Sequence, residues 1–400
     1  MNEKERLAET LLRCGLDLRV DQVLYLSLPV ELFDFGRIVA RVAYRMKAKF
    51  VHIEYFDPQV DDHHLNESDF DVLTHVAHLR SRTQVGFAQD KAAFLRIRDG
   101  GVYQIDADKA RKEQYNKIIN ESLFPFRTFS QGNEISVCST VLPTQNWANH
   151  VFPELSDEDA LNALWQKIFS ITHSDRKNGI GFWMKHRQEI VGRRNYLNQR
   201  RIVSMEFKSQ HCHLTLRLPT NHIWVGGVEQ TKSGQLCMPN FPTEEIFTAP
   251  LRNSLNGWIR NTRPLLYQNE KIDSFQLRFE EGVASVDYCH VNPEGLMNCL
   301  AFDEGAKYCG EIALLPGETL VSQSQTVFNN TLLDENAGCH LAIGNSYPCN
   351  LDPYKGISFD DVNHSKQHID ITFGSKDIHV TAIDSDGNPF EIIHDGKFKI

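Results

Sequence analysis

The feature that most constrains the fold of this chain is a change of secondary-structure pattern about halfway along it. The first hundred residues alternate between helical spacing of apolar residues (5–14 and 32–46) and apolar strands (22–28 and 50–55). Strands separated by helices usually pair in parallel, with the helices on the faces of the sheet. This part therefore predicts an α/β N-terminal domain with a parallel sheet. The same pattern continues as a helix over 70–81, a strand over 84–88 and a helix over 91–96.

Beyond Arg201 short strands dominate, and turn sequences such as Asp386-Gly387 and Asp395-Gly396 separate them. This pattern of short strands and turns predicts a larger α+β C-terminal domain with mainly antiparallel sheet. Helical segments at 108–119, 156–170 and 177–199 come before it. We place the boundary at the first of them, which gives domains of residues 1–107 and 108–400.

Composition excludes several classes of function. The formal net charge is −10, whereas a nucleic-acid surface needs a basic patch. No apolar run approaches the roughly 20 residues of a membrane span. The nine cysteines are scattered and form no Cys-x-x-Cys pair, which favours free thiols in a reducing compartment and predicts a cytoplasmic protein.

Four segments carry residues suited to metal chemistry. In the first, Glu244 and Glu245 are adjacent, so only one of them can face a site from an extended strand. In the second, Glu311 precedes an apolar run, where a carboxylate is costly unless it is paired or metal-bound. Gly310 before it allows a second backbone to approach closely. Each acid also has an ordinary explanation, as a solvated loop residue or as the end of a strand.

The other two segments add imidazoles. Glu335 and His340 lie in a short turn-prone stretch before an apolar strand. His368 and Asp370 are two residues apart, so on a strand they point to the same face. The alternatives are a core histidine and a half-exposed edge strand. Carboxylates and imidazoles together suit a divalent metal site. His211 and His213 are better explained as surface histidines than as a further site.

Four strings in order, NFPTEEIFTAP, GAKYCGEIAL, DENAGCHLAIG with Tyr347 following, and HIDITFGS, resemble the thermophilic-aminopeptidase family of metallo-aminopeptidases, the aminopeptidase S/T type. The resemblance covers essentially the whole chain. It implies release of N-terminal residues from short peptides, a homodimer, and two divalent ions, which are zinc, cobalt or manganese. The metal ligands it implies are Glu245, Glu311, Glu335, His340, His368 and Asp370.

The resemblance also implies catalytic roles for Glu311 and Tyr347. Glu311, or Glu335 beside it, would move the proton, and the Tyr347 phenol would donate to the developing oxyanion. The charges of four carboxylates balance those of two divalent ions. Two other functions stay open on the sequence: a dinuclear phosphoesterase, which would need basic residues such as Arg217 near the site, and a metal- or peptide-binding protein without catalysis. No interaction with nucleic acid or membrane is expected.

Overall fold

The computed structural model describes residues 1–101, 108–268, 270–352 and 361–400. Contacts divide the chain into two compact units, unit 1 with Met1–Lys185 and Val228–Pro242, and unit 2 with His186–Gly227 and Thr243–Ile400. These units differ in extent from the predicted division at residue 107, which remains a prediction about domains. The predicted combination of a parallel N-terminal sheet and antiparallel C-terminal sheets is confirmed.

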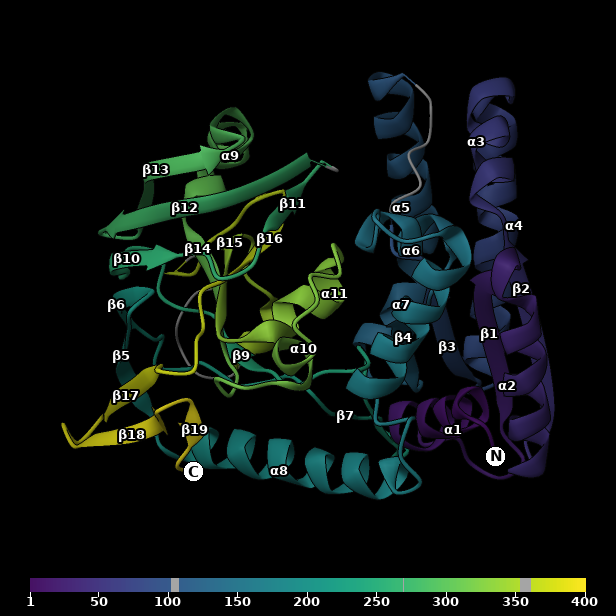
Figure 1. The fold of residues 1–400 in the computed structure, drawn as a ribbon, viewed down its shortest axis with the longest axis horizontal. Coiled ribbons are helices and arrows are strands. Elements are labelled where there is room, and N and C mark those ends of the chain that lie inside the picture. Colours follow the sequence, from purple (N-terminus) through teal and green to yellow (C-terminus); the bar gives the residue numbers. More distant parts are fainter. Residues whose placement is uncertain (102–107, 269, 353–360) are drawn as a thin grey trace. The chain divides into compact units, whose positions relative to one another are not determined.

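Unit 1 is built on a four-stranded parallel sheet in the order β2-β1-β3-β4 (Figure 1). Its strands are β1 (Val23–Pro29), β2 (Phe50–Phe56), β3 (Ala93–Arg98) and β4 (Val137–Val141). Its helices are α1 (Glu3–Thr10), α2 (Phe33–Arg45), α3 (Pro58–Glu67), α4 (Phe70–Gln89), α5 (Lys109–Gln131), α6 (Gln145–Val151) and α7 (Asp157–Ile171). Short elements are the π-helical turn Leu11–Gly15, the 3₁₀ turn Val30–Leu32, and the strands β7 (Glu229–Gln230) and β8 (Leu236–Cys237).

Alternate side chains of β1 pack against different helices. Tyr25 belongs to a buried cluster with Ala88 of α4 and Phe126 of α5. On the other face, α2 approaches so closely that a Cβ at Gly36 would lie 3.2 Å from Leu28 Cδ1. Helices therefore cover both faces of the sheet, as strand–helix alternation predicts.

Two of the predicted elements in this unit are wrong. Residues 84–88 continue α4 and are not a strand, because the buried residues Leu73, Ala77, Ser81 and Ala88 follow helical spacing. Residues 91–96 are not a helix, because the run from Ala93 forms β3, paired on both sides and mostly buried. Ser156 caps the start of α7, since its Oγ accepts a hydrogen bond from the Asp159 amide.

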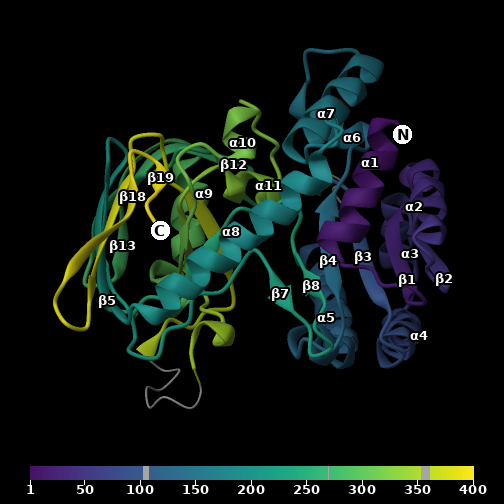
Figure 2. The ribbon, with the colours of Figure 1, turned by 90° about the horizontal axis from the view of Figure 1, so that it is seen from below.

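Unit 2 contains a nine-stranded antiparallel sheet in the order β11-β12-β10-β6-β5-β17-β18-β19, with β13 paired to β12. Its strands are β5 (Ile202–Ser209), β6 (Cys212–Arg217), β10 (Asn256–Arg260), β11 (Leu265–Tyr267), β12 (Glu270–Glu280), β13 (Val283–Val291), β17 (His379–Asp384), β18 (Pro389–His394) and β19 (Lys397–Phe398). Helix α8 (Gly179–Gln199) begins in unit 1 and ends in unit 2; Figure 2 shows its full length.

A second sheet of unit 2 has four antiparallel strands in the order β16-β15-β14-β9. They are β9 (Ile246–Thr248), β14 (Cys309–Leu314), β15 (His340–Gly344) and β16 (His368–Thr372). Short helices connect these strands: α9 (Pro293–Leu300), α10 (Leu320–Gln323), α11 (Thr331–Asp334), and the 3₁₀ turns Glu304–Lys307, Glu335–Ala337 and Pro348–Asn350. Every residue of β14 and β15 is buried, so this sheet forms the centre of unit 2.

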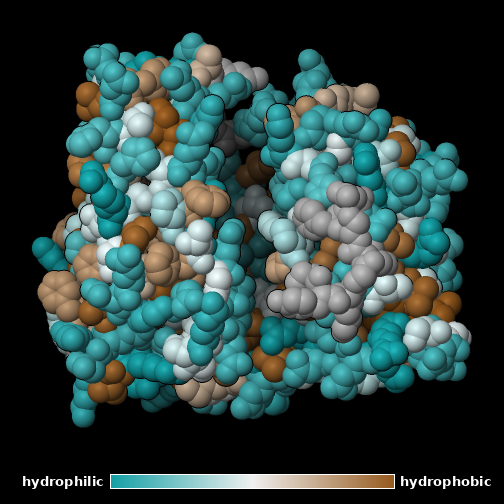
Figure 3. Space-filling model, turned by 180° about the vertical axis from the view of Figure 1, so that it is seen from behind, coloured by the Kyte–Doolittle hydropathy of each residue, from teal (hydrophilic) through white to brown (hydrophobic). Residues whose placement is uncertain are grey.

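Hydrophilic residues cover most of the face in Figure 3, and apolar residues gather there only in small groups. Among the described residues, no helix is both long and apolar enough to cross a membrane.

Candidate metal centre

The pairing register of the four-stranded sheet brings two predicted acids into one row. Glu311 of β14 lies opposite Ala342 of β15, and Ala342 lies opposite Asp370 of β16. Directly opposed residues point to the same face of a sheet. The small Ala342 side chain therefore separates the two carboxylates and leaves space above the middle strand.

The two predicted imidazoles share this face. His340 is two residues from Ala342, and His368 is two residues from Asp370, so each lies on the face of its neighbour. The prediction that His368 and Asp370 form a pair on one face of a strand is confirmed. Gly310 makes the row possible, because a Cβ there would overlap the carbonyl oxygens of Gly344 and Asn345.

The donor atoms form two groups that share one glutamate. His340 Nε2 lies 3.4 Å from Glu245 Oε2 and 3.7 Å from Glu311 Oε1. His368 Nε2 lies 3.7 Å from Glu311 Oε2 and 3.4 Å from Asp370 Oδ1. Within each group the donor atoms lie within 4.8 Å of one another. The two oxygens of Glu311 thus face different imidazoles.

Backbone carbonyls orient both rings. His340 Nδ1 lies 3.2 Å from the Gly338 carbonyl oxygen, and His368 Nδ1 lies 2.8 Å from the Asn345 carbonyl oxygen. A carbonyl can only accept, so Nδ1 carries a proton in each ring and donates it. In a neutral ring this directs the Nε2 lone pair toward the carboxylates, which is the usual orientation of histidines that bind a metal.

The adjacent acids Glu244 and Glu245 have separate environments. Glu245 faces His340, whereas Glu244 Oε1 accepts a hydrogen bond of 2.6 Å from the Leu320 amide at the start of α10. Burial raises the pKa of Glu244 to about 7, although Leu320 and Arg193 act to lower it. The structure therefore turns one acid toward the imidazoles and uses the other to cap a helix.

Asn336 is a residue that the sequence reasoning missed. Its side chain is 1 % exposed, and its Oδ1 accepts from the Glu244 amide at 2.9 Å. Its Nδ2 donates to the Leu332 carbonyl oxygen at 3.0 Å. The residue thus connects the segment before β9 to the turn that carries Glu335. In the sequence, the only sign of this role is that Asn336 directly follows the acid Glu335.

Glu335 lies in the 3₁₀ turn that follows α11 and belongs to neither of the two donor groups. Burial raises its pKa well above the usual range, and the negative charges of Glu245 and Asp370 raise it further. Those charges act on it because it is close to the same cluster. Five of the six predicted ligands therefore form the two donor groups of unit 2, and Glu335 lies close to them.

Tyr347 lies at the edge of this cluster. Its ring centroid is 4.7 Å from that of His368 and 6.2 Å from that of Phe247. Burial of the hydroxyl raises its pKa, and the nearby charges of Glu311 and Asp370 raise it further. The phenol therefore keeps its proton at neutral pH and can act as a donor.

The electrostatics show that the donor set, without a bound cation, favours the binding of protons. Burial raises the pKa of Glu311 to about 7, with further contributions from Asp370 and Glu245. Burial would lower the pKa values of both histidines, but hydrogen bonds to carboxylates outweigh it: the pKa of His368 rises to about 9 and that of His340 rises well above its usual value.

These residues fit a divalent-metal centre. Buried carboxylates need paired charge, and the oriented Nε2 atoms and carboxylate oxygens are ligands that zinc, cobalt and manganese accept. Among the described residues, His211 and His213 belong to no such group. His213 Nε2 instead lies 3.1 Å from Glu206 Oε1 at the surface.

Comparisons with known proteins agree with this centre. A family model described as thermophilic metalloprotease (M29) matches residues 2–398. Aminopeptidase 2 of Geobacillus stearothermophilus is 33 % identical over 99 % of this chain and 97 % of its own. Aminopeptidase T of Thermus aquaticus is 32 % identical over 99 % of this chain and 98 % of its own.

A solved structure, wild-type AmpT from Thermus thermophilus, superposes with a TM-score of 0.89 at 30 % identity, covering 100 % of this chain and 99 % of that one. The predicted resemblance is thus confirmed along the whole length. The chain belongs to the thermophilic metalloprotease (M29) family.

Proposed function

We propose that this protein is an aminopeptidase that removes N-terminal residues from short peptides with two divalent metal ions. The observation that carries the proposal is the pair of donor groups that share Glu311. Glu245 and His340 complete one group, and His368 and Asp370 complete the other. Glu335, close to both, is the sixth ligand in the proposal. The aminopeptidase names of the relatives support the reaction.

The divalent ions would supply Lewis acidity toward a peptide carbonyl and make a water molecule nucleophilic near neutral pH. The protein's own residues orient the metal ligands and supply a hydrogen-bond donor. Gly338 and Asn345 hold the imidazoles in the tautomer that leaves Nε2 available. Tyr347, at the edge of the cluster, donates its hydroxyl proton to an oxyanion, because its raised pKa keeps it protonated.

A buried glutamate would accept the proton of the attacking water and return it to the leaving amine. Glu311 and Glu335 are the two candidates, and burial raises the pKa of both, that of Glu311 to about 7. Both oxygens of Glu311 face imidazoles, whereas Glu335 lies outside the two groups. Because Glu311→Gln is also expected to lose metal, Glu335→Gln distinguishes the two roles: a Glu335→Gln protein that keeps its metal but no longer hydrolyses substrate makes Glu335 the base.

The test compares an aminoacyl amide or dipeptide with the same compound acetylated at its α-amine. We expect hydrolysis of the free-amine compound, loss of hydrolysis with a chelator, and recovery with zinc, cobalt or manganese. Equal cleavage of the acetylated compound would contradict an aminopeptidase, since that compound has no free amine. Absence of any hydrolysis after loading with each metal would favour a binding protein.

The same experiment includes phosphoester substrates. The charged groups that act most strongly on Glu311 and Glu335 are carboxylates and imidazoles, whereas a phosphate would need arginine or lysine. We therefore expect no phosphoesterase activity. The cytoplasmic location and the homodimer also remain proposals. Sedimentation velocity of the purified protein tests the second.

A further inference from the structure

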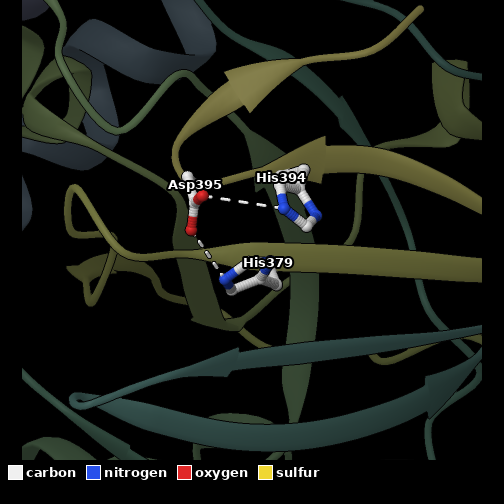
Figure 4. A group of neighbouring side chains, drawn as sticks. All are labelled: His379, His394 and Asp395. Atoms are coloured by element: carbon white, nitrogen blue, oxygen red, sulfur yellow. Dashed lines mark ion pairs between the residues drawn. The ribbon is translucent and has the colours of Figure 1, made fainter.

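We propose a second, peripheral metal site at the C-terminal hairpin, formed by His379, His394 and Asp395. Figure 4 shows the three side chains turned toward one another. His379 begins β17, His394 ends β18, and Asp395 starts the turn into β19. None of them belongs to the catalytic centre proposed above, and the inference does not depend on that function.

The distances suit a tetrahedral ion. Asp395 Oδ1 lies 3.0 Å from His379 Nε2, and Asp395 Oδ2 lies 3.6 Å from His394 Nε2. Bonds of about 2.0–2.2 Å to a tetrahedral zinc ion place its ligand atoms about 3.4 Å apart. One donor atom from each residue lies within 4.8 Å of the others, so modest rotation of the rings closes the site.

The carboxylate of Glu391 orients one of the proposed ligands, His394. His394 Nδ1 lies 2.9 Å from Glu391 Oε1. The carboxylate accepts the Nδ1 proton, so in the neutral ring the Nε2 lone pair faces Asp395. A carboxylate that holds the far nitrogen of a ligating histidine is a recurrent feature of zinc sites, and its loss typically weakens binding about 10–100-fold.

The backbone holds Asp395 in place. Asp395 and Gly396 both have positive φ, at 47° and 66°, a conformation that Asp tolerates and Gly favours. The Gly396 amide donates to the Ile378 carbonyl oxygen at 2.9 Å, beside His379. The turn is therefore fixed against β17, and the three donors meet without any rearrangement of the chain.

The chemistry of the donors points to the class of ion. Two imidazoles and one carboxylate suit zinc, copper or nickel and do not suit calcium or magnesium, which prefer oxygen. The side chains of His379 and His394 are 37 % and 41 % exposed, so water completes the coordination and the ion exchanges with solvent. Its effect is to clamp the β18–β19 hairpin to β17.

The test uses full-length protein whose tightest metal sites are already filled with zinc. Further zinc is added by equilibrium dialysis, and bound metal per chain is measured. We expect one additional equivalent in the wild type. In His379→Ala and in His394→Ala we expect its affinity to fall by at least about tenfold. Glu391→Gln should weaken it by about 10–100-fold.

His213→Ala is the matched control, because His213 is also a surface histidine beside a carboxylate, Glu206. It should leave the additional equivalent unchanged. Electron paramagnetic resonance of protein given one equivalent of copper in place of the added zinc should show two nitrogen ligands, and only one in His394→Ala. Peptidase activity should stay unchanged in the hairpin variants.

No additional equivalent in the wild type would overturn the proposal. So would undiminished binding in the double variant His379→Ala/His394→Ala. Either result would mean that the three side chains form only an ion-pair network. Thermal unfolding without added zinc establishes that each variant is folded.

Discussion

The two four-stranded sheets of this protein carry different kinds of side chain. The parallel sheet of unit 1 packs apolar and aromatic side chains against helices on both faces, and on β1 the Tyr25 hydroxyl donates a hydrogen bond to Glu54 of β2. The antiparallel sheet of unit 2 gathers carboxylates and imidazoles on one face. The first arrangement stabilises the fold by burial. The second costs stability unless cations are present.

The largest expected effect comes from removing the donor that both groups share. Glu311→Gln keeps the shape of the side chain but takes away its negative charge. We expect loss of tightly bound metal and a fall in kcat/KM of at least about 10³-fold, because metal ions contribute several kcal/mol to transition-state stabilisation. Metal content after dialysis and peptidase assays measure both. Full metal content would show that Glu311 is not a ligand.

Tyr347→Phe should separate catalysis from metal binding. We expect normal metal content and a kcat lower by about 10²–10³-fold, the usual cost of one oxyanion donor, roughly 2.7–4 kcal/mol. Tyr288→Phe is the control, since Tyr288 has a similar exposed fraction on β13, 37 % against 40 %. An unchanged kcat in Tyr347→Phe would remove the residue from the mechanism.

Asn336→Ala should weaken the four-stranded sheet of unit 2 that carries the metal ligands (the polar sheet, β16-β15-β14-β9), because Asn336 holds two of its connecting segments together. The change leaves the Glu244 amide without its partner, and an unsatisfied buried group costs about 1–3 kcal/mol of unfolding free energy. Because these bonds hold the segment of Glu245 beside the turn of Glu335, metal affinity should fall as well. Denaturant unfolding and metal titration test this together. A stability loss with unchanged metal affinity would limit Asn336 to a structural role.

Protons and cations should compete for the polar sheet. The pKa of His368 is raised to about 9, so the metal-free ring holds a proton at pH 7; burial alone would lower this pKa, but the bond to Asp370 raises it. Metal binding must release that proton. Affinity should therefore rise with pH up to about 9, by roughly tenfold per pH unit for each proton displaced. Calorimetry in buffers of different ionisation enthalpy measures the release, and a flat profile from pH 6.5 to 8.5 would contradict it.

Tyr25→Phe should have the smallest effect on activity. It removes the hydrogen bond to Glu54 and should cost about 1.5–3 kcal/mol of unfolding free energy, typical of a bond to a charged group. We expect kcat and metal content to stay at the wild-type level. A change in metal content would show that the two sheets are not independent.

Much of the site could be predicted because its residues lie in short, ordered motifs. The two-residue spacing of His368 and Asp370 fixes a shared face once 368–372 is a strand. The role of Gly310 follows from the need for close backbone approach. The choice between Glu244 and Glu245 could not be made from alternation alone, because it depends on the Leu320 amide, 76 residues away.

Other features depended on contacts between distant segments. His379 and His394 meet only because β17 pairs with β18, and nothing in their spacing indicates it. The wrong prediction of a strand at 84–88 also arose because contacts with distant segments decide the structure there. Val85 and Phe87 form a short apolar pattern, but packing against Tyr25 and Phe94 keeps them in a helix.

Anomalous diffraction from crystals of the metal-loaded protein tests the central claim most directly. We expect two peaks on the polar sheet, one contacted by Glu245, Glu311 and His340, the other by Glu311, His368 and Asp370. Data from Glu311→Gln crystals should lack at least one of them. A fully loaded, active enzyme with no peak among these side chains would contradict the account.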